Sequence, residues 1–147
     1  MIENSEVKDG VLTMSCMFDA NVSRVYQAWA DPSNISQWMG PGTVTCESVD
    51  IDLQVGGKYR LAMRTDDGVM TAFGEYREIE TDSKLVFTWQ WENGSFTDSL
   101  VTLNFSEVEG QTRLQLIHTE LPDQGVAEHH GQGWTGSLVK LEHFLAG

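Results

Sequence analysis

The sequence predicts an α+β fold in which a curved antiparallel β-sheet of about six to seven strands wraps around a long C-terminal helix. Apolar and polar residues alternate in consecutive segments separated by turn-forming pairs, which is typical of antiparallel strands joined by hairpins. Near the C-terminus the apolar residues change to the spacing of a helix. A length of 147 residues suits one domain, so we expect residues 1–147 to fold as a single unit.

The first strand and a short helix are predicted near the N-terminus. Residues 11–18 carry an apolar side chain at nearly every other position, which indicates a strand. Asn21 or Ser23 can cap the following helix, because their side-chain oxygens accept hydrogen bonds from unpaired backbone N–H groups. The apolar face of that helix has the spacing i, i+3, i+4 and consists of Val25, Ala28 and Trp29.

A second short helix is predicted directly after the first. Pro32 ends the first helix at Asp31, because the residue before a proline avoids the helical conformation. Residues 33–39 then form another helical turn, and the Gly-Pro-Gly run at 40–42 breaks it. The two short helices are expected to fill the gap between the first strand and the rest of the sheet.

Consecutive strands are predicted after these helices. The Asp-Gly pair at 67–68 marks a hairpin, because it suits the positive φ angles of tight turns. The expected strands lie at 43–53, 58–65, 69–79, 85–91, 101–105 and 114–118, with turns at 56–57, 66–68, 81–83, 92–94 and 109–110. Strands joined in this way form an antiparallel meander.

The predicted C-terminal helix has one apolar stripe. Its members are spaced i, i+4, i+7 and i+11, and they are Trp134, Leu138, Leu141 and Leu145, with Phe144 beside them. A helix added to such a sheet must bury this stripe against the concave face. Residues 123–133 contain three glycines, so we expect a loop or a weak first turn there.

The chain is strongly acidic, with 22 Asp and Glu against 9 Lys and Arg and a net charge of −13. Nucleic-acid binding and adsorption to an anionic membrane both need clustered positive charge, so neither is expected. We interpret the acidity as a source of solubility, with an electrostatic interface for a basic protein partner as the alternative. No apolar run approaches the ~20 residues of a membrane helix, so membrane insertion is not expected either.

The cysteines and the N-terminal residues favour a cytoplasmic protein. The first ten residues are acidic and polar and lack the basic and apolar regions of a secretory signal. Cys16 and Cys46 lie inside predicted strands, where we expect both thiols to be buried, free and reduced.

Several segments, taken in order, match a known pattern. They are 18–20 (FDA), 25–29 (VYQAW), 38–41 (WMGP), 52–53 (DL), 56–59 (GGKY), 85–89 (LVFTW), 112–118 (TRLQLIH) and 133–134 (GW). The ordered set resembles the SRPBCC/START-like superfamily, within it the activator of heat-shock-protein-90 ATPase homologue (AHSA) branch. The resemblance implies the helix-grip fold of the birch-pollen allergens and a small, cytoplasmic, ligand-binding type of domain, often of unassigned function. It does not imply chaperone regulation.

We predict a cavity for a small hydrophobic molecule or a lipid between the sheet and the C-terminal helix. Aromatic side chains and methionines suit a flat or flexible apolar ligand. The predicted lining is Trp38, Tyr59, Met63, Phe87, Trp89, Trp91, Leu103, Leu116, His118, Trp134 and Leu138. The alternative is that these side chains simply pack against one another as the core. No cofactor is expected.

His118 is predicted to face inward, where a buried imidazole needs partners for both nitrogens. It can orient a polar group of a ligand or act as an acid or base, which leaves an enzyme of the cyclase or hydrolase kind as an alternative function. The other interpretation is a core histidine with satisfied hydrogen bonds. Arg64 and Arg77 are expected to face solvent, unless one enters the cavity to pair with a ligand carboxylate.

No catalytic residue and no metal site are predicted. The sequence contains no nucleophile elbow, phosphate loop, dinucleotide fingerprint or zinc-protease motif. Glu128, His129 and His130 lie near Asp123 and His143 in sequence, but adjacent histidines on a helix point in different directions. We therefore expect an exposed polar loop at 128–130. The chain is expected to be a monomer or a homodimer.

Overall fold

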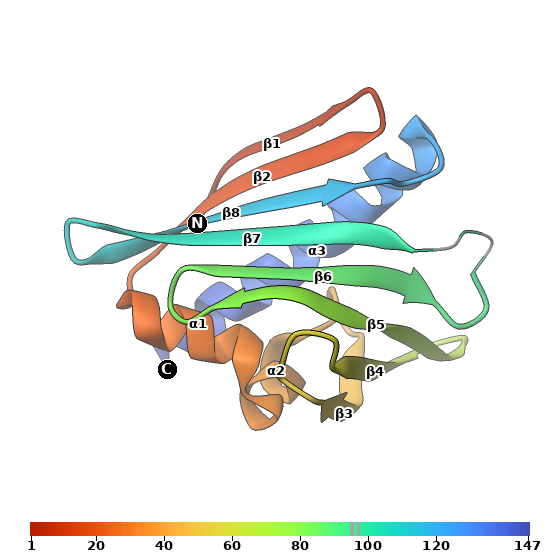
Figure 1. Cartoon of the computed structure of the whole chain (residues 1–147), viewed down its shortest axis with the longest axis horizontal. Helices are drawn as coiled ribbons and strands as arrows, with labels where there is room; N and C mark the ends of the chain where they lie inside the picture. Colours follow the sequence, from red (N-terminus) through yellow and green to blue (C-terminus); the bar gives the residue numbers. More distant parts are fainter. Residues whose placement is uncertain (95, 97) are drawn as a thin grey trace.

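The computed structural model describes residues 1–94, 96 and 98–147, and in these residues one antiparallel sheet of eight strands packs with three helices (Figure 1). The strands are ordered β1-β2-β8-β7-β6-β5-β4-β3 across the sheet. The elements are β1 (Ile2–Lys8), β2 (Val11–Phe18), α1 (Val22–Ala30), α2 (Pro32–Trp38), β3 (Thr45–Ile51), β4 (Lys58–Thr65), β5 (Gly68–Glu80), β6 (Lys84–Trp91), β7 (Ser99–Val108), β8 (Gln111–Thr119) and α3 (Gln124–Ala146).

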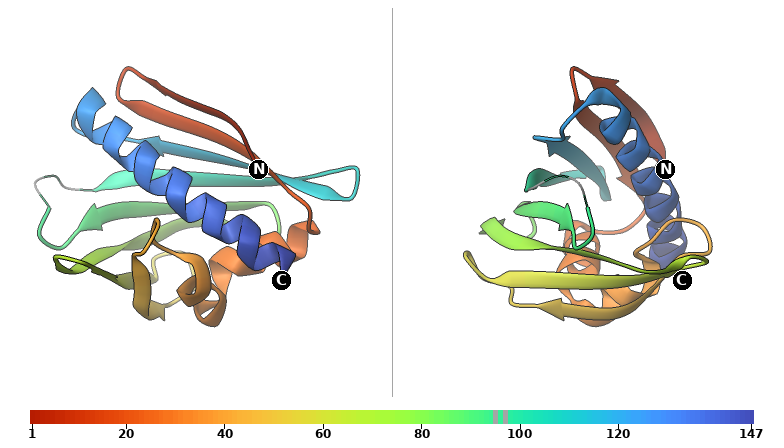
Figure 2. Two further views of the ribbon diagram at one scale, coloured as in Figure 1. Left: turned by 180° about the vertical axis from the view of Figure 1, so that it is seen from behind. Right: turned by 90° about the vertical axis from the view of Figure 1, so that its right-hand side faces the viewer.

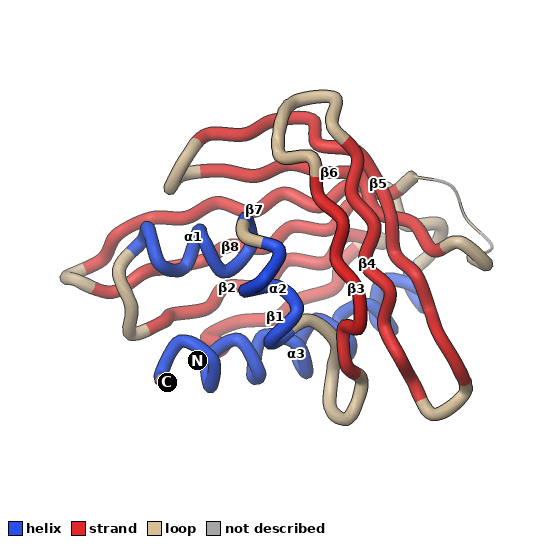
Figure 3. Tube along the Cα trace, turned by 90° about the horizontal axis from the view of Figure 1, so that it is seen from below, coloured by secondary structure: helices blue, strands red, loops and turns tan. Residues whose placement is uncertain are grey.

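The long helix α3 lies across the concave face of the sheet, which curves around it from β1 to β3 (Figure 2). The short helices α1 and α2 bridge the chain between β2 and β3 (Figure 3). This arrangement confirms the predicted helix-grip fold, including the two short helices after the strand at 11–18 and the long helix at the C-terminus.

Alternation along the strands explains which side chains reach the interior. In β2 every second side chain is buried, starting at Leu12. The register of β2 on β8 pairs Leu12 with His118 and Met14 with Leu116, and none of these four side chains is exposed. The same alternation continues through β7, so the middle of the sheet presents a continuous apolar face.

The short helices begin and end as the sequence predicts. Asn21 is the N-cap of α1, and its side chain accepts a hydrogen bond from the Arg24 backbone N–H at 2.8 Å. Asp31 ends α1 and caps α2, where Pro32 occupies the first turn. The buried Trp38 indole of α2 donates to the Ala28 carbonyl at 2.9 Å and so ties the two helices together.

The acidic N-terminal segment forms an edge strand, β1, that the sequence did not predict. Only Ile2 and Val7 pack against the core, so the segment has too few apolar residues to show alternation. Its backbone pairs with β2, because the edge of a sheet offers unpaired N–H and C=O groups to any adjacent extended segment. The N-terminal ammonium also lies 2.6 Å from Glu142 of α3.

The expectation of a loop at 123–133 is wrong, because α3 already begins at Gln124. Asp123 caps the helix by accepting a hydrogen bond from the Val126 backbone N–H at 2.9 Å. The glycines are tolerated because tertiary packing outweighs their low helix propensity. At Gly131, a Cβ atom would lie 3.2 Å from the Leu12 side chain, so this glycine allows the helix to approach β2 closely.

Gly74 of β5 should be intolerant of a side chain. It lies opposite Tyr59 in the β4–β5 register, and a Cβ atom at this position would overlap the Thr88 backbone oxygen, which accepts the Tyr59 hydroxyl hydrogen bond. We expect Gly74→Ala to lower the free energy of unfolding by roughly 3 kcal/mol. Urea denaturation measures this change.

The matched control is Gly133→Ala in α3, where a Cβ atom meets nothing within 4 Å. There the substitution should stabilise the protein by about 1 kcal/mol, because alanine favours the helix. Equal effects of the two substitutions would contradict the close approach at Gly74.

Candidate functional site

A cavity of about 580 Å³ lies between β4, β5 and β6, the segment 39–44 and the N-terminal half of α3. Most of its described lining is apolar or aromatic. These lining residues are Met39, Pro41, Val44, Met63, Val69, Met70, Trp89, Trp91, Phe96, Val126 and Trp134. Because the cavity is bounded by both the sheet and α3, it is the space in which a molecule can lie between them.

The predicted lining divides into two groups. Met63, Trp89, Trp91 and Trp134 border this cavity. The others lie in the interior, between 0 and 6% exposed, and do not border it; they are Trp38, Tyr59, Phe87, Leu103, Leu116, His118 and Leu138. Their side chains pack in the core over the sheet, whereas the cavity lies toward the N-terminal half of α3.

Other lining residues were not predicted from the sequence. Met39, Val44 and Phe96 lie outside helices and strands. Met39 was expected in the turn at 33–39 and Val44 in the strand at 43–53, but α2 ends at Trp38 and β3 begins at Thr45. Val126 and Gly133 belong to the part of α3 that was expected to be a loop. Val126, His130 and Trp134 are spaced four residues apart, so they continue the apolar stripe of the C-terminal helix toward its N-terminus. This spacing was the signal in the sequence that could have predicted the helix there.

His118 takes part in a chain of buried hydrogen bonds. The Trp134 indole donates to His118 Nδ1 at 3.1 Å, and His118 Nε2 lies 2.8 Å from Ser99 Oγ. The Ser99 hydroxyl donates its one proton to the Trp89 carbonyl at 2.6 Å, so at His118 it must accept. His118 is therefore the neutral Nε2–H tautomer, with both nitrogens engaged within the protein.

His130 forms a second such contact beside the first. Its Nδ1 lies 2.9 Å from the Val126 carbonyl, to which it donates, and its Nε2 accepts from the Trp91 indole at 3.1 Å. The His118 and His130 ring centroids are 5.1 Å apart, nearly perpendicular to each other. Two indoles of the cavity wall are thus held in place by two imidazoles.

The burial of both imidazoles keeps them uncharged. Desolvation lowers the pKa of His118 from 6.5 to about 3, and the nearby His130 adds to the shift. Desolvation also lowers the pKa of His130. Since His118 has no free nitrogen and does not border the cavity, its position gives no support to acid–base chemistry on a ligand there.

The segment 39–44 is fastened to α3 and forms one wall of the cavity. Lys140 Nζ donates to the carbonyls of Gly40 and Val44 at 2.6 and 2.7 Å, and desolvation lowers its pKa. The Gly40 N–H donates to Ser137 Oγ at 3.3 Å. Gly136 permits the approach, because a Cβ atom there would lie 2.5 Å from the Pro41 side chain.

The arginines considered as partners of a ligand carboxylate lie on the surface instead. The Arg64 side chain is 58% exposed and pairs with Glu47 at 3.0 Å. The Arg77 side chain is 51% exposed and lies 3.9 Å from Glu75. Neither residue borders the cavity.

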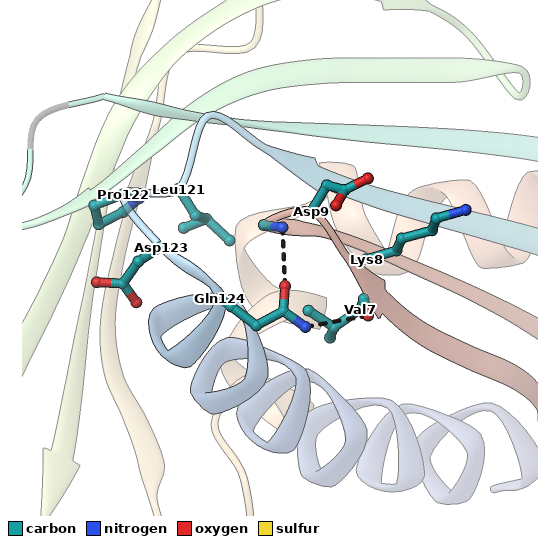
Figure 4. Close-up of a pocket in the computed structure, with 8 residues that line it drawn as sticks. Val7, Lys8, Asp9, Leu121, Pro122, Asp123 and Gln124 are labelled. Carbon is teal, nitrogen blue, oxygen red and sulfur yellow. Dashed lines mark hydrogen bonds between the residues drawn. The ribbon is translucent and has the colours of Figure 1, made fainter.

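A second hollow of about 510 Å³ lies where the β1–β2 turn meets the start of α3 (Figure 4). Gln124 joins the two sides: its Oε1 accepts from the Gly10 N–H at 3.0 Å and its Nε2 donates to the Val7 carbonyl at 3.3 Å. We interpret this hollow as the junction of α3 with the edge of the sheet, because its central polar groups are already paired within the chain.

Residues 128–130 belong to α3, not to an exposed polar loop. Within residues 1–94, 96 and 98–147, no group of three or more His, Cys, Asp or Glu side chains lies close enough to hold a metal ion. Across the same residues, no helix combines the length and the apolar character that a membrane span requires.

An antiparallel sheet closed over one long helix, with a cavity against that helix, defines a helix-grip domain of the SRPBCC/START-like superfamily. Within that class, the model of the activator of Hsp90 ATPase homolog 1-like proteins matches residues 19–146. The chain belongs to this family, as the motifs of the sequence predict.

Solved structures from several bacteria share the fold. The AHSA1 protein from Silicibacter pomeroyi is 27% identical, with a TM-score of 0.81 over 92% of this chain and 97% of that one. Protein Ms6760 from Mycobacterium smegmatis is 21% identical, with a TM-score of 0.85 over 99% and 97% of the two chains. A protein from Arthrobacter aurescens is 22% identical, with a TM-score of 0.86 over 99% and 92%. No curated protein sequence matches the chain.

Replacing His118 with Gln should reduce the pH dependence of stability. Above pH 6.5 the imidazole is neutral in the folded and unfolded chains alike; below it only the unfolded chain binds a proton, so stability is lost as the pH falls toward 3. Between pH 7.5 and 5 the loss due to His118 is about 2 kcal/mol.

Urea unfolding of the wild type and His118→Gln at both pH values measures the difference. Glutamine retains one acceptor for Trp134 and one donor for Ser99, so the variant is expected to fold. An equal loss of stability in both proteins would contradict a neutral, buried His118.

Proposed function

We propose that the protein binds a small hydrophobic or aromatic molecule in the cavity between β4–β6 and α3. The observation that carries the proposal is a cavity of about 580 Å³ with a mainly apolar wall, bounded by the sheet and by α3. Cavities of roughly 300–1,000 Å³ with such walls are typical of small-molecule sites. Membership of a family with the helix-grip fold, which commonly holds hydrophobic ligands, supports the same conclusion.

The wall suits an apolar occupant for energetic reasons. Each 100 Å² of apolar surface removed from water contributes about 2.5 kcal/mol. Val69 and Met70 are well exposed at the cavity and Trp91 is half-buried, so these side chains offer apolar surface for a ligand to cover. Met39 and Met63 are flexible and adapt to the outline of a ligand.

The cavity also has an apolar approach from outside. Val69 and Met70, near the β4–β5 hairpin, border it and are 42% and 49% exposed. Exposed apolar side chains at the edge of a cavity are a feature of binding sites, because a hydrophobic molecule gains contact before it is fully enclosed. We also propose a cytoplasmic location, with which the two free, buried thiols of Cys16 and Cys46 agree.

Native mass spectrometry of the purified protein and displacement of the uncharged dye Nile red test the proposal directly. The expected result is a retained apolar mass or saturable dye binding that lipids or aromatic compounds reverse. Absence of both would overturn the proposed function.

Substituting Gly133 with Leu should block the cavity without removing any side chain from its wall. Gly133 borders the cavity, and a Cβ atom there meets nothing within 4 Å, so the new side chain occupies space that is now empty. We expect the affinity for Nile red to fall at least about tenfold, which corresponds to ~1.4 kcal/mol.

The matched control is Gln132→Leu, an exposed residue of the same helix that does not border the cavity. This variant should bind the dye as the wild type does. Equal binding by Gly133→Leu and Gln132→Leu would place the dye somewhere other than this cavity.

A further inference from the structure

One contact in the cavity wall depends on an uncharged imidazole. His130 of α3 and Trp91 of β6 both border the cavity, and the Trp91 indole N–H donates to His130 Nε2 at 3.1 Å. An indole nitrogen only donates, so His130 Nε2 must carry a lone pair. The His130 Nδ1–H donates to the Val126 carbonyl at 2.9 Å. The ring therefore uses one donor and one acceptor, which is the capacity of its neutral form.

Protonation of His130 is incompatible with this contact. An imidazolium has two donors and no acceptor, so its Nε2–H would face the N–H of the Trp91 indole. The bond to Val126 holds the other nitrogen of the ring to α3. Trp91 is the last residue of β6 and is only half-buried, so the indole is the partner that can move away. A proton on His130 thus removes the hydrogen bond that fixes this part of the wall.

The groups on the same helix do not stabilise a positive charge on His130. The ring of His129, with its centroid 6.3 Å away, disfavours a second charge. The carboxylates of Asp123 and Glu128 accept hydrogen bonds elsewhere, from the Val126 backbone N–H and from Gln124. The ion pairs found among the described residues do not include His130.

The elements packed against His130 also bring it no negative charge. From β6 and the segment after it come the aromatic rings of Trp91 and Phe96. From β8 comes His118, which is itself neutral, with its ring centroid 5.1 Å away. Desolvation in these surroundings lowers the pKa of His130 below its ordinary 6.5, although the Val126 carbonyl acts in the opposite direction. The imidazole is therefore neutral at neutral pH and gains a proton only in acid.

We propose that His130 makes ligand binding in this cavity pH-dependent: the neutral imidazole holds Trp91 in the wall, and protonation in mildly acidic solution releases Trp91 and weakens the binding of apolar molecules. This inference rests on the proposed function, because it concerns the regulation of the same cavity.

The direction of the effect follows from linkage. An apolar molecule that covers the wall removes water from an imidazolium there, so it binds the neutral form more tightly. The pKa of His130 is consequently lower in the complex than in the empty protein. Affinity is then constant above about pH 6.5, where His130 is neutral in both states, and falls as the pH drops through the pKa of the empty protein.

Fluorescence titration of the wild type with Nile red at about pH 7.5 and pH 5 tests the proposal. We expect the dissociation constant to rise at least about threefold at the lower pH, since each pH unit below the pKa of the empty protein changes affinity by up to about tenfold. Circular dichroism at both pH values establishes that the protein is folded in each titration.

His130→Gln should bring the ratio of the two dissociation constants close to one. The glutamine oxygen can accept from Trp91 and its nitrogen can donate to the Val126 carbonyl, but the side chain does not titrate. The matched control is His129→Gln, the same change at an exposed residue that also borders the cavity. It should keep at least the wild-type ratio, because it leaves the Trp91 contact in place and removes a charge that opposes protonation of His130.

Nuclear magnetic resonance of the wild type gives a test that needs no variant to bind. The ring resonances of His130 and the indole proton of Trp91 should shift with one common midpoint between about pH 5 and 6.5, and Nile red should lower that midpoint. A Trp91 resonance that does not follow His130 would contradict the release of the indole.

The outcomes separate the two proposals. If Nile red binds at neither pH, the proposed function fails and this inference fails with it. If it binds equally at both pH values, or if His130→Gln keeps the wild-type ratio, the cavity still binds apolar molecules and only the role of His130 is overturned. The same holds if His130 stays neutral down to about pH 5.

Discussion

The structure depends above all on the docking of α3 against the concave face of the sheet. Leu138 and Leu141 are almost completely buried beneath it, and Trp134 donates a hydrogen bond to His118 near the C-terminal end of β8. The contact is close because glycine stands where other backbones approach: Gly131 faces Leu12 and Gly136 faces Pro41. Without this contact the sheet would expose its apolar face, and neither the core nor the cavity would exist.

The same contact determines which polar groups are available in the cavity. Burying Trp134 and Trp91 requires acceptors for their indoles, and His118 and His130 supply them as neutral imidazoles. A buried network is stable only when its members are satisfied, and these histidines use both nitrogens inside the protein. The role of the two histidines is therefore structural: they hold the Trp134 and Trp91 indoles in the cavity wall. The Trp89 indole, which has no acceptor among the described residues, is the exception within that network.

Alternation and turn chemistry predicted most of the fold. The alternation is clear in β2, β7 and β8, where every second side chain is buried over most of the strand. These patterns did not predict β1, because its pairing depends on the free edge of β2. Nor did they predict the helix at 124–133, where the packing of α3 on the sheet outweighs the low helix propensity of glycine. The candidate site was less predictable. Leu116 and Trp89 both point inward, but whether such a side chain meets another side chain or empty space depends on the curvature of the sheet and on distant segments such as 39–44.

The glycine at position 133 is not explained by a close approach of another segment, unlike the other two glycines in the same part of α3. A glycine within a helix costs about 1 kcal/mol relative to alanine, and at Gly131 and Gly136 that cost is explained by a neighbouring residue that a side chain would strike. At Gly133 no atom beyond the adjacent residues and the helix's own backbone lies within 4 Å of the missing Cβ, so no neighbouring segment requires glycine there. Its structural effect is to leave volume in the cavity that it borders. Local preferences are most readily sacrificed at functional sites, so this exception supports a cavity that is kept open for a molecule.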